Sequence, residues 1–365
     1  AGNGGGIKVV NNSTVDMSNT VIQSNIVTTD GAGVSILDST VINITDSRIT
    51  SNNAIRYGGG FYINSINGRN SLNIENSFIQ GNQTSGWNGF ENSGIAGGGI
   101  YIASSPLENT TATINKTVFS DNFSFNGGSI FAESATIKLN SCAFYRNNTG
   151  SQFNSGIIEL IDNINFELFN VTTTNNIANE GSFIKNTNTY DSEISTVISI
   201  KNSILWDPFE YQIVYDDDND QPGELFIHNS NLNGGITSVS IYDNILLDWG
   251  EKNINENPLF IDITNDDLKL SDESPCLGIG IDNPLSFDIL NQPRPLPFGS
   301  KPDLGAYENI YGLYGDVTMS GGVSSLDAAL VLKHVVGMDT LDPILIFYGD
   351  VSQNGNLTSL DASYI

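Results

Sequence analysis

The chain has few basic residues and few cysteines. Lys and Arg total 14 against 41 Asp and Glu in 365 residues, which gives a formal net charge of −27. Because this charge repels phosphate backbones and anionic membrane surfaces, neither nucleic acid nor lipid headgroups are expected as partners. Two cysteines, Cys142 and Cys276, are too few for a disulfide-stapled fold. No apolar run reaches the length of about 18 residues that a membrane span requires.

Both ends of the chain are predicted to be interrupted. Gly4-Gly5-Gly6-Ile7 resembles the middle of a motif that recurs later, and there is no initiating Met. Ile365 falls inside a segment that is expected to be helical. We therefore expect the sequence to be part of a longer precursor.

Residues 1–240 carry a repeat of about 27 residues. Eight segments align on three slots, at relative positions −2, 0 and +5, and every slot except Thr173 is apolar in a chain that is only 39% hydrophobic. Alternation with polar residues at the first two slots is typical of a strand with one buried face. The aligned sets are Val15, Met17 and Ile22; Ile42, Ile44 and Ile49; Leu72, Ile74 and Ile79; Ala112, Ile114 and Phe119; Ile137, Leu139 and Phe144; Phe166, Leu168 and Thr173; Ile198, Ile200 and Leu205; Leu225, Ile227 and Leu232.

Corner residues recur between these slots. Small polar residues that can bond to a turning backbone stand at +2, asparagines stand at +8 in six repeats, and glycines precede a third strand at 58–60, 97–99 and 127–128. The +2 set is Asn19, Asp46, Asn76, Lys116, Ser141, Asn170, Asn202 and Asn229, and the +8 set is Asn25, Asn52, Asn82, Asn122, Asn147 and Asn176.

Three short strands per repeat predict an all-β fold, a right-handed parallel β-helix. Asparagines in register bond to their copies in adjacent rungs and stabilise such a stack. The 37 glycines and the β-branched alternation exclude a solenoid of helices.

Residues 241–310 are expected to hold the final rungs and a cap, because the period dissolves and turn formers accumulate there. The ordered motifs in this region are Asn257-Pro258-Leu259-Phe260, Ser274-Pro275-Cys276, Arg294-Pro295 and Asp303-Leu304-Gly305-Ala306-Tyr307-Glu308. Together they resemble the end of the bacterial surface β-helix proteins called choice-of-anchor Q proteins. The resemblance implies secretion and attachment through a variable C-terminal anchor, and it implies no enzyme activity.

Residues 311–365 contain two similar segments, 315–328 and 349–362. Each places side-chain oxygens at loop positions 1, 3, 5, 9 and 12 and glycine at position 6, a pattern that folds hard oxygen ligands around one Ca²⁺. The apolar run Ala328–Val336 then predicts a helix that ends at Gly337. The sequence therefore predicts a small α-helical calcium-loop module.

The duplicated Gly-Asp-Val loops, each with Asp at position 12, resemble type I dockerins, which join cellulosomal and surface proteins to cohesins. By that resemblance, Ca²⁺ would be bound by Asp316, Thr318, Ser320, Gly322, Ser324 and Asp327, and by Asp350, Ser352, Asn354, Asn356, Thr358 and Asp361. The family usually has Asn or Asp at the positions of Thr318, Ser320 and Ser352, so we expect a weak affinity suited to extracellular calcium. Partner recognition would fall on Ser325, Leu326, Ser359 and Leu360. The alternative is a calcium clip that only braces the C-terminus.

No catalytic constellation is predicted. A β-elimination site needs a basic residue with a cation or Arg clamp, and a hydrolase site needs grouped carboxylates. Arg48, Arg56 and Arg69 are candidates for the first kind of site, with surface charges as the alternative. His228 and His334 are expected to be structural or solvent-facing.

Two further groups of residues have a functional and a plain interpretation. The segment 216–220 is interpreted as a solvated acidic loop, with a further cation site as the alternative. A set of aromatics either packs on the β-helix or forms a sugar-stacking face. These aromatics are Trp87, Phe90, Tyr101, Trp206 and Phe209.

These features favour an extracellular or cell-surface, non-catalytic β-helix that acts in adhesion, carbohydrate contact or fibre-like assembly. Its expected partners are a cohesin-like domain or another copy of the same chain, with a polysaccharide as a further candidate. The alternative function is a dockerin-borne polysaccharide lyase or glycoside hydrolase of the β-helix type.

Overall fold

A computed structural model describes residues 4–65, 68–86, 95–150, 155–178, 181–188, 195–217, 222–281, 284–296, 300–309, 314–318, 320, 322–352 and 354–365. The chain divides into two compact units. The first consists of Ala1–Pro258 with Leu304–Ala306, and the second consists of Leu259–Asp303 with Tyr307–Ile365.

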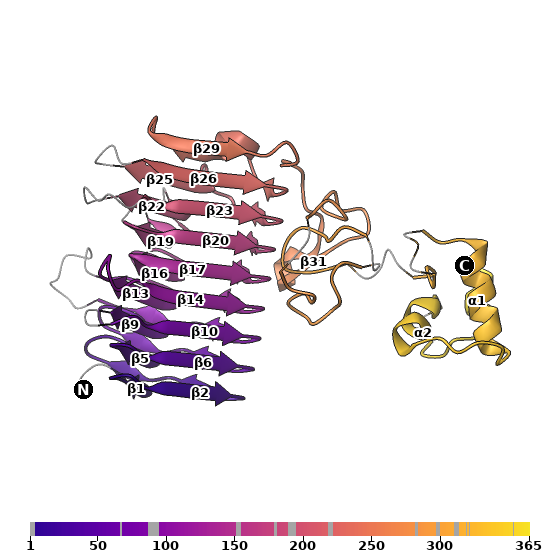
Figure 1. The fold of residues 1–365 in the computed structure, drawn as a ribbon, viewed down its shortest axis with the longest axis horizontal. Helices are drawn as coiled ribbons and strands as arrows, with labels where there is room; N and C mark the ends of the chain where they lie inside the picture. Colours follow the sequence, from indigo (N-terminus) through magenta and orange to yellow (C-terminus); the bar gives the residue numbers. More distant parts are fainter. Residues whose placement is uncertain are drawn as a thin grey trace. The chain divides into compact units, whose positions relative to one another are not determined.

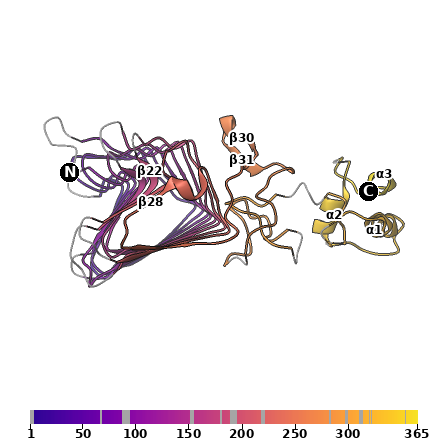
Figure 2. The same ribbon diagram turned by 90° about the horizontal axis from the view of Figure 1, so that it is seen from above.

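The first unit is a parallel β-solenoid, which confirms the β-helix predicted from the repeat. Its strands stack rung on rung in three long sheets and one short one (Figure 1). Figure 2 looks along the stack and shows successive turns lying over one another around a common interior. The apolar residues of the repeat fill that interior as one continuous core.

The strands of the four sheets are parallel to their neighbours throughout the described residues. Sheet 1 contains β1 (Ile7–Val9), β5 (Val34–Leu37), β9 (Phe61–Ser65), β13 (Ile100–Ser104), β16 (Ile130–Glu133), β19 (Gly156–Ile161), β22 (Ser182–Asn188), β25 (Ile213–Asp217) and β28 (Val239–Ile241). Sheet 2 contains β2 (Thr14–Ser18), β6 (Val41–Thr45), β10 (Ser71–Glu75), β14 (Thr110–Asn115), β17 (Ala135–Asn140), β20 (Asn165–Phe169), β23 (Val197–Lys201), β26 (Gly223–His228) and β29 (Ile245–Trp249). Sheet 3 contains β3 (Val21–Gln23), β7 (Arg48–Thr50), β11 (Phe78–Gln80), β15 (Val118–Ser120), β18 (Ala143–Tyr145), β21 (Thr172–Thr174), β24 (Ile204–Trp206) and β27 (Asn231–Leu232). Sheet 4 contains β4 (Ile26–Val27), β8 (Asn53–Ala54) and β12 (Gln83–Thr84), and a 3₁₀ turn, η2, spans Gly235–Ser238.

The strand register is the one that the repeat alignment predicts. In sheet 2, Val15 pairs with Ile42, and the same column continues rung by rung to Leu225. In sheet 3, the +5 residues pair in the same way from Ile22 to Leu232. A slip of one residue would turn the apolar side chains of a strand to solvent, so the buried face determines this register.

The polar residues at +2 form a corner of the solenoid. All eight adopt a left-handed backbone conformation, with φ between 46° and 53°. Asn and Asp tolerate this region better than other residues that have a Cβ, because their short polar side chains bond locally. Lys116 adopts the same conformation, and its ammonium group pairs with Glu75 at 2.9 Å.

The asparagines at +8 form a buried ladder along the stack. From Asn52 onward, each Oδ1 accepts bonds from the backbone N–H and the side-chain amide of the preceding rung, as in the pair Asn82 and Asn122, where both distances are 3.1 Å. The amides from Asn52 to Asn176 also donate to a core carbonyl, for example from Asn122 to Ile79 O at 2.8 Å. The ladder ends at Asp207, which accepts from the backbone and the amide of Asn176 at 2.8 and 3.0 Å. The ladder satisfies polar groups that would otherwise be orphaned inside the core.

Replacing Asn122 with Ala is expected to lower the free energy of unfolding by about 2–4 kcal/mol, because two donors of Asn82 would lose their acceptor inside the core. Denaturant titration followed by circular dichroism measures the loss. Asn43→Ala is the matched control, since Asn43 is only half-buried and bonds to Asp16 and Asn73 at 2.6 and 2.8 Å outside the core, and we expect a loss below about 1 kcal/mol there. Equal losses in the two variants would contradict the structural role of the ladder.

Glycines occupy the corner before sheet 1 because the rungs approach too closely for a side chain. A Cβ on Gly59 would lie 2.5 Å from the carbonyl oxygen of Gly98, and a Cβ on Gly98 would lie 2.4 Å from that of Gly128. Both distances are far below van der Waals contact, so no other residue fits without a shift of the backbone.

The segment Leu304–Ala306 packs on the solenoid as part of the first unit. The Gly305 carbonyl accepts from the Asn170 amide at 3.0 Å, and the Gly305 N–H donates to the Asn202 carbonyl at 2.7 Å. The Ala306 N–H donates to Thr172 Oγ1 at 2.8 Å. A Cβ on Gly305 would lie 2.4 Å from the same oxygen, so this approach requires glycine.

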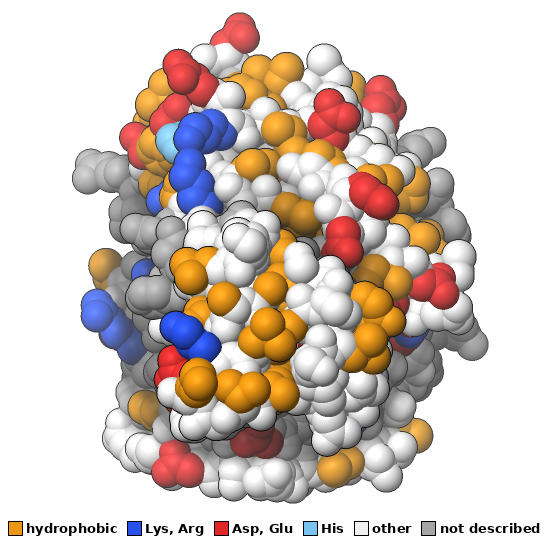
Figure 3. All heavy atoms as spheres, turned by 90° about the vertical axis from the view of Figure 1, so that its right-hand side faces the viewer, with side chains coloured by type: hydrophobic (Ala, Val, Ile, Leu, Met, Phe, Trp, Pro, Cys, Tyr) orange, Lys and Arg blue, Asp and Glu red, His pale blue; other side chains and the backbone are white. Residues whose placement is uncertain are grey.

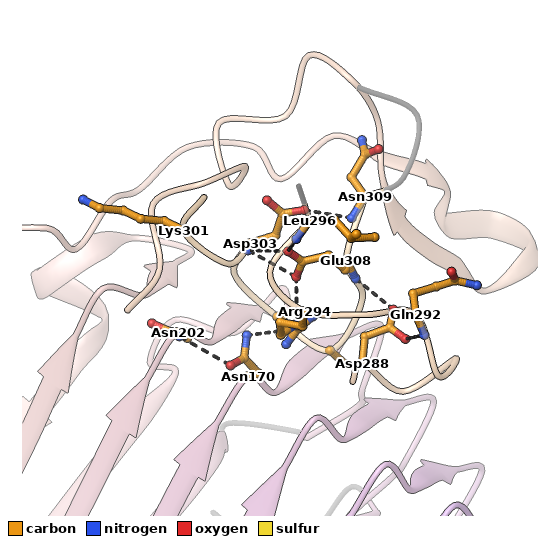
Figure 4. Close-up of polar contacts among 12 residues, drawn as sticks. Asn170, Asn202, Asp288, Gln292, Arg294, Leu296, Lys301, Asp303, Glu308 and Asn309 are labelled. Atoms are coloured by element: carbon orange, nitrogen blue, oxygen red, sulfur yellow. Dashed lines mark hydrogen bonds and ion pairs between the residues drawn. The ribbon is translucent and has the colours of Figure 1, made fainter. Parts of the chain in front are cut away.

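The cap in the second unit is held by buried charges. It contains β30 (Phe260–Asp262), η3 (Ile263–Asn265) and β31 (Asp267–Leu270). Arg294 Nε lies 2.7 Å from Glu308 Oε2, and both side chains are fully buried. Asp303 accepts from the N–H groups of Gly278 and Asn309 at 2.7 and 2.8 Å (Figure 4). Asp303 and Glu308, the two ends of this motif, therefore connect several loops of the cap through hydrogen bonds and an ion pair.

The two cysteines are separate free thiols, and both are buried. Burial raises the pKa of the Cys142 thiol to about 12, so it stays protonated and serves as a small core residue.

Candidate calcium site and partner surface

The C-terminal module is built from α1 (Ser325–Val335), α2 (Pro343–Gly349) and α3 (Ser359–Tyr364). Its core contains Val317, Val331 and Leu341. The loops before α1 and α3 end in capping boxes, in which Ser324 and Thr358 cap the helices and the Asp at the third helical position bonds back. The two similar sequence segments therefore fold into the same local structure.

The first loop closes around two carboxylates, Asp316 and Asp327, which are 1% and 0% exposed. Asp316 accepts from the Thr318 hydroxyl and the Gly322 N–H, both at 3.1 Å. Asp327 Oδ1 accepts from the Thr318 N–H at 2.7 Å. Its Oδ2 accepts from the N–H and the hydroxyl of Ser324 at 2.8 and 2.7 Å. The two carboxylates, one at each end of the loop, thus accept hydrogen bonds from the residues between them.

The second loop repeats this network around Asp350 and Asp361. Asp350 accepts from the Ser352 hydroxyl at 3.2 Å and from the Gly355 N–H at 2.7 Å. Asp361 Oδ1 accepts from the Ser352 N–H at 2.9 Å, and its Oδ2 accepts from the N–H and the hydroxyl of Thr358, both at 2.8 Å. The equivalent side chains of the two loops therefore have equivalent partners, whereas the glycine N–H donor comes from position 7 in the first loop and from position 6 in the second.

The remaining predicted ligands lie at the exposed side of each loop. The N–H groups of Ser320 and Asn354 donate to the first aspartate of their loops at 3.0 and 3.1 Å. The Gly322 carbonyl accepts from the Ser320 hydroxyl at 3.0 Å, and the Asn356 N–H donates to Asn354 Oδ1 at 2.9 Å. Each predicted ligand set is thus brought together within its own loop.

The aspartates at position 12 stay ionised. Burial alone would raise the pKa of Asp327, but hydrogen bonds from Thr318 and Ser324 outweigh it and hold the pKa below its usual range. Ser352 and Thr358 lower the pKa of Asp361 in the same way. Because these pKa values are depressed in the folded state, the stability that they contribute is present above the ordinary Asp value and is lost as the pH falls through the folded value.

The chemistry of both loops fits Ca²⁺, which takes oxygen ligands only. Each loop holds two carboxylates, and within the described ranges no group of three or more His, Cys, Asp or Glu side chains is arranged to hold a metal. Hydroxyl, amide and carbonyl oxygens would supply the other ligands. A site with only two carboxylates among its ligands is expected to bind Ca²⁺ with low affinity.

The predicted partner residues lie at the first turns of α1 and α3. Leu326 is 60% exposed and Leu360 is 46% exposed, and Ser325 and Ser359 beside them are exposed as well. Each leucine is the neighbour of a position-12 aspartate in sequence. The calcium loops and the exposed leucines therefore belong to the same two helix starts.

The module exposes more apolar residues than the sequence analysis identified. Figure 3 shows hydrophobic side chains at the surface, with Asp and Glu scattered among them. The additional exposed residues of the module are Val323, Leu332, Val335, Val336, Met338 and Tyr364. Helical periodicity assigned the run after Ala328 to a helix, but only the packing in the structure shows which of its side chains are exposed to solvent.

The three arginines considered for catalysis lie on or beside different strands. Arg48 lies on β7 with its guanidinium 4.2 Å from the centre of the Phe78 ring. Arg56 follows β8 and forms two hydrogen bonds with Asp30, at 3.1 and 2.8 Å. Arg69 is exposed before β10. Two of the three thus have local structural partners.

The histidines have structural contacts. His228 Nε2 lies 3.0 Å from Asp248 Oδ2, and His334 Nδ1 accepts from the Leu341 N–H at 3.1 Å. In the acidic segment 216–220, Asp216 lies 3.9 Å from Lys185 Nζ, whereas 218–220 lie outside the described residues.

The aromatic residues have different environments. Tyr101 stacks with Tyr57, Tyr62 and Phe131 at ring-centre distances of 4.5, 5.5 and 5.3 Å, so its faces are covered by other rings. Trp206 ends β24 and is half-buried, and Trp87 and Phe90 lie outside the described residues. Phe209 packs partly against the solenoid core.

Comparison with known families identifies the C-terminal module. Residues 314–365 match the family described as Dockerin type I domain. Type I dockerin domains in general bind calcium, a dockerin implies a cohesin partner, and proteins that carry one are generally extracellular or found at the cell surface. No curated protein matches the chain. Among the helices that the structure describes, none is long and apolar enough to cross a membrane.

Proposed function

We propose that this chain is an extracellular, non-catalytic β-solenoid that is joined to a cohesin-like partner through a calcium-loaded dockerin domain. The observation that carries the proposal is the pair of similar loops. In each loop a buried aspartate accepts hydrogen bonds from the loop backbone, and an exposed leucine precedes that aspartate in the sequence. The solenoid would contribute adhesion, carbohydrate contact or fibre-like assembly.

Calcium and partner binding are coupled in this proposal through the position-12 aspartates. Asp327 and Asp361 belong to the predicted ligand sets and also to the capping boxes of α1 and α3. A bound cation would hold the first turn of each helix, where Leu326 and Leu360 are exposed. Loss of calcium would therefore loosen the surface that the partner contacts.

The cap supports a role at the cell surface. Its motifs resemble those of choice-of-anchor Q proteins, and Arg294, Asp303 and Glu308 of these motifs meet in one buried cluster. The division into rungs at 1–240, final rungs and cap at 241–310 and calcium module at 311–365 is part of the proposal. The second candidate for the partner is another copy of this chain, because a head-to-tail contact that does not close generates a filament.

Replacing Leu326 and Leu360 with Asp is expected to abolish partner binding while leaving calcium binding nearly intact, because neither side chain supplies a ligand. Calcium-dependent pull-down with type I cohesins and light scattering of the full chain measure the two kinds of association. Leu107→Asp is the control, since Leu107 is 81% exposed and lies on the solenoid.

Three results distinguish the alternatives. If the chain binds a cohesin and a chelator abolishes this binding, the proposal is supported. A scattering signal that grows when calcium is added would favour self-association. If neither occurs, the module is only a brace for the C-terminus.

A further inference from the structure

A cavity of about 390 Å³ opens on the solenoid beside β25 and β28. This volume lies within the range of about 300–1,000 Å³ that is typical of small-ligand sites. Two aromatic and three polar residues contribute to its wall, and Val214 adds an apolar surface. The five residues are Phe209, Tyr211, Glu210, Asp216 and Ser240.

The loop 208–211 that supplies both aromatic rings is fixed at its two ends. Gln212 is fully buried, and its amide donates to the Asp207 carbonyl at 2.8 Å while its Oε1 accepts from the Asp207 N–H at 3.4 Å. The Asn233 amide donates to the same carbonyl at 2.9 Å. The Asp207 carboxylate is the last member of the asparagine ladder. The wall is thus formed before any ligand arrives, which lowers the entropic cost of binding.

The charges around the cavity are partly compensated. Lys185 Nζ lies 3.9 Å from Asp216 Oδ2, and only 15% of the Lys185 side chain and 31% of the Asp216 side chain are exposed. Glu210 is exposed to solvent. The carboxylates therefore remain hydrogen-bond acceptors, while the field that they present is smaller than that of two free charges.

We infer that this cavity binds a short segment of an uncharged polysaccharide. A pyranose ring has an apolar C–H face that packs on an aromatic ring, and its hydroxyls donate to carboxylates in charge-assisted hydrogen bonds. Two carboxylates in the wall disfavour a uronate polymer, because like charges repel. Lys185 beside Asp216 disfavours an organic cation. The inference rests on the proposed carbohydrate contact and names its site and ligand class.

The test uses the full chain with calcium present. Affinity electrophoresis and titration calorimetry with soluble glucans, xylans, mannans and galactans should show binding to at least one of them. Tyr211→Ala should weaken that binding about tenfold or more, since truncation of a central aromatic contact removes most of the packing. Tyr242→Ala is the matched control, because Tyr242 is 50% exposed on the same unit and does not line this cavity, so its affinity should be unchanged.

Three outcomes would overturn the inference. The first is no binding to any of the four neutral polymers, and the second is equal weakening of binding by both tyrosine variants. The third is binding of polygalacturonate or of polylysine that is tighter than that of the neutral polymers and is lost in Tyr211→Ala. Each leaves the dockerin assay unaffected, because cohesin pull-down is measured separately. A failed pull-down with intact glycan binding would contradict the dockerin proposal alone.

Discussion

Chelation of calcium is expected to lower the melting temperature of the C-terminal module and to leave the solenoid transition in place. A cation that binds only the folded loops stabilises them by mass action, by about 2.7 kcal/mol per loop when free calcium is 100-fold above its dissociation constant. The solenoid is held by its own apolar core and asparagine ladder. Calorimetry of the full chain with calcium and with chelator measures both transitions.

Variants make the calcium prediction specific to the loops. Asp327→Ala and Asp361→Ala each remove a buried acceptor that holds two segments of a loop together, so each should reproduce part of the effect of the chelator. Asp339→Ala is the matched control, because Asp339 is an exposed aspartate of the same module outside both loops. An unchanged module transition under chelator would refute the calcium assignment.

Replacing Arg294 with Met is expected to destabilise the cap by about 3–5 kcal/mol above pH 8, where Glu308 is ionised, because removal of one partner leaves a buried carboxylate without its counter-charge. Glu308, Asp303 and Asp288 all belong to this cluster (Figure 4). Hydrogen exchange read by mass spectrometry on peptides over 284–309 measures the loss locally. Arg69→Met is the control, since Arg69 is exposed. Equal exchange in both variants would contradict the role assigned to the cluster.

The same cluster makes the stability of the cap fall as the pH rises. Burial raises the pKa of Glu308 to about 8 and outweighs the attraction of Arg294, and burial raises the pKa of Asp303 to about 6. The folded cap therefore holds more protons than the unfolded chain between about pH 4.5 and pH 8, and stability is lost across that window. The calcium loops have the opposite sign, because their position-12 aspartates have lowered pKa values. Melting at pH 5 and pH 8.5 in excess calcium tests the direction for the cap, and Glu308→Gln should reduce the difference.

The repeat alignment predicted the strand register residue by residue, and one of its slots departs from the apolar pattern. Thr173 is the one slot that is not apolar, and in the structure its hydroxyl donates to the buried carboxylate of Asp207. Asp207 is the seventh member of the ladder, but the offset of +8 missed it because that rung is one residue shorter. A fixed spacing cannot follow such a deletion, whereas hydrogen bonding between rungs can.

The two similar loops of the C-terminal module were predictable because the residues that form them are local in sequence. Every oxygen that a loop gathers lies within twelve consecutive residues, and the capping boxes that orient them have a sequence pattern of their own. The partner residues Leu326 and Leu360 were placed by resemblance, and the structure shows that both are exposed. Which further apolar residues are exposed could not be predicted, because that depends on how the three helices pack.

The sequence by itself determined the parallel solenoid, its register and the two similar loops of the C-terminal module, because each depends on periodicity or on short-range spacing that can be read from the sequence. Tertiary structure alone decided where distant residues meet. Arg294 reaches Glu308 within a cap that has no repeat, and the loop 208–211 forms a cavity wall only when Gln212 and Asn233 fix its base. The physical reason is that burial and long-range hydrogen bonding depend on which surfaces come together, and no local pattern encodes that.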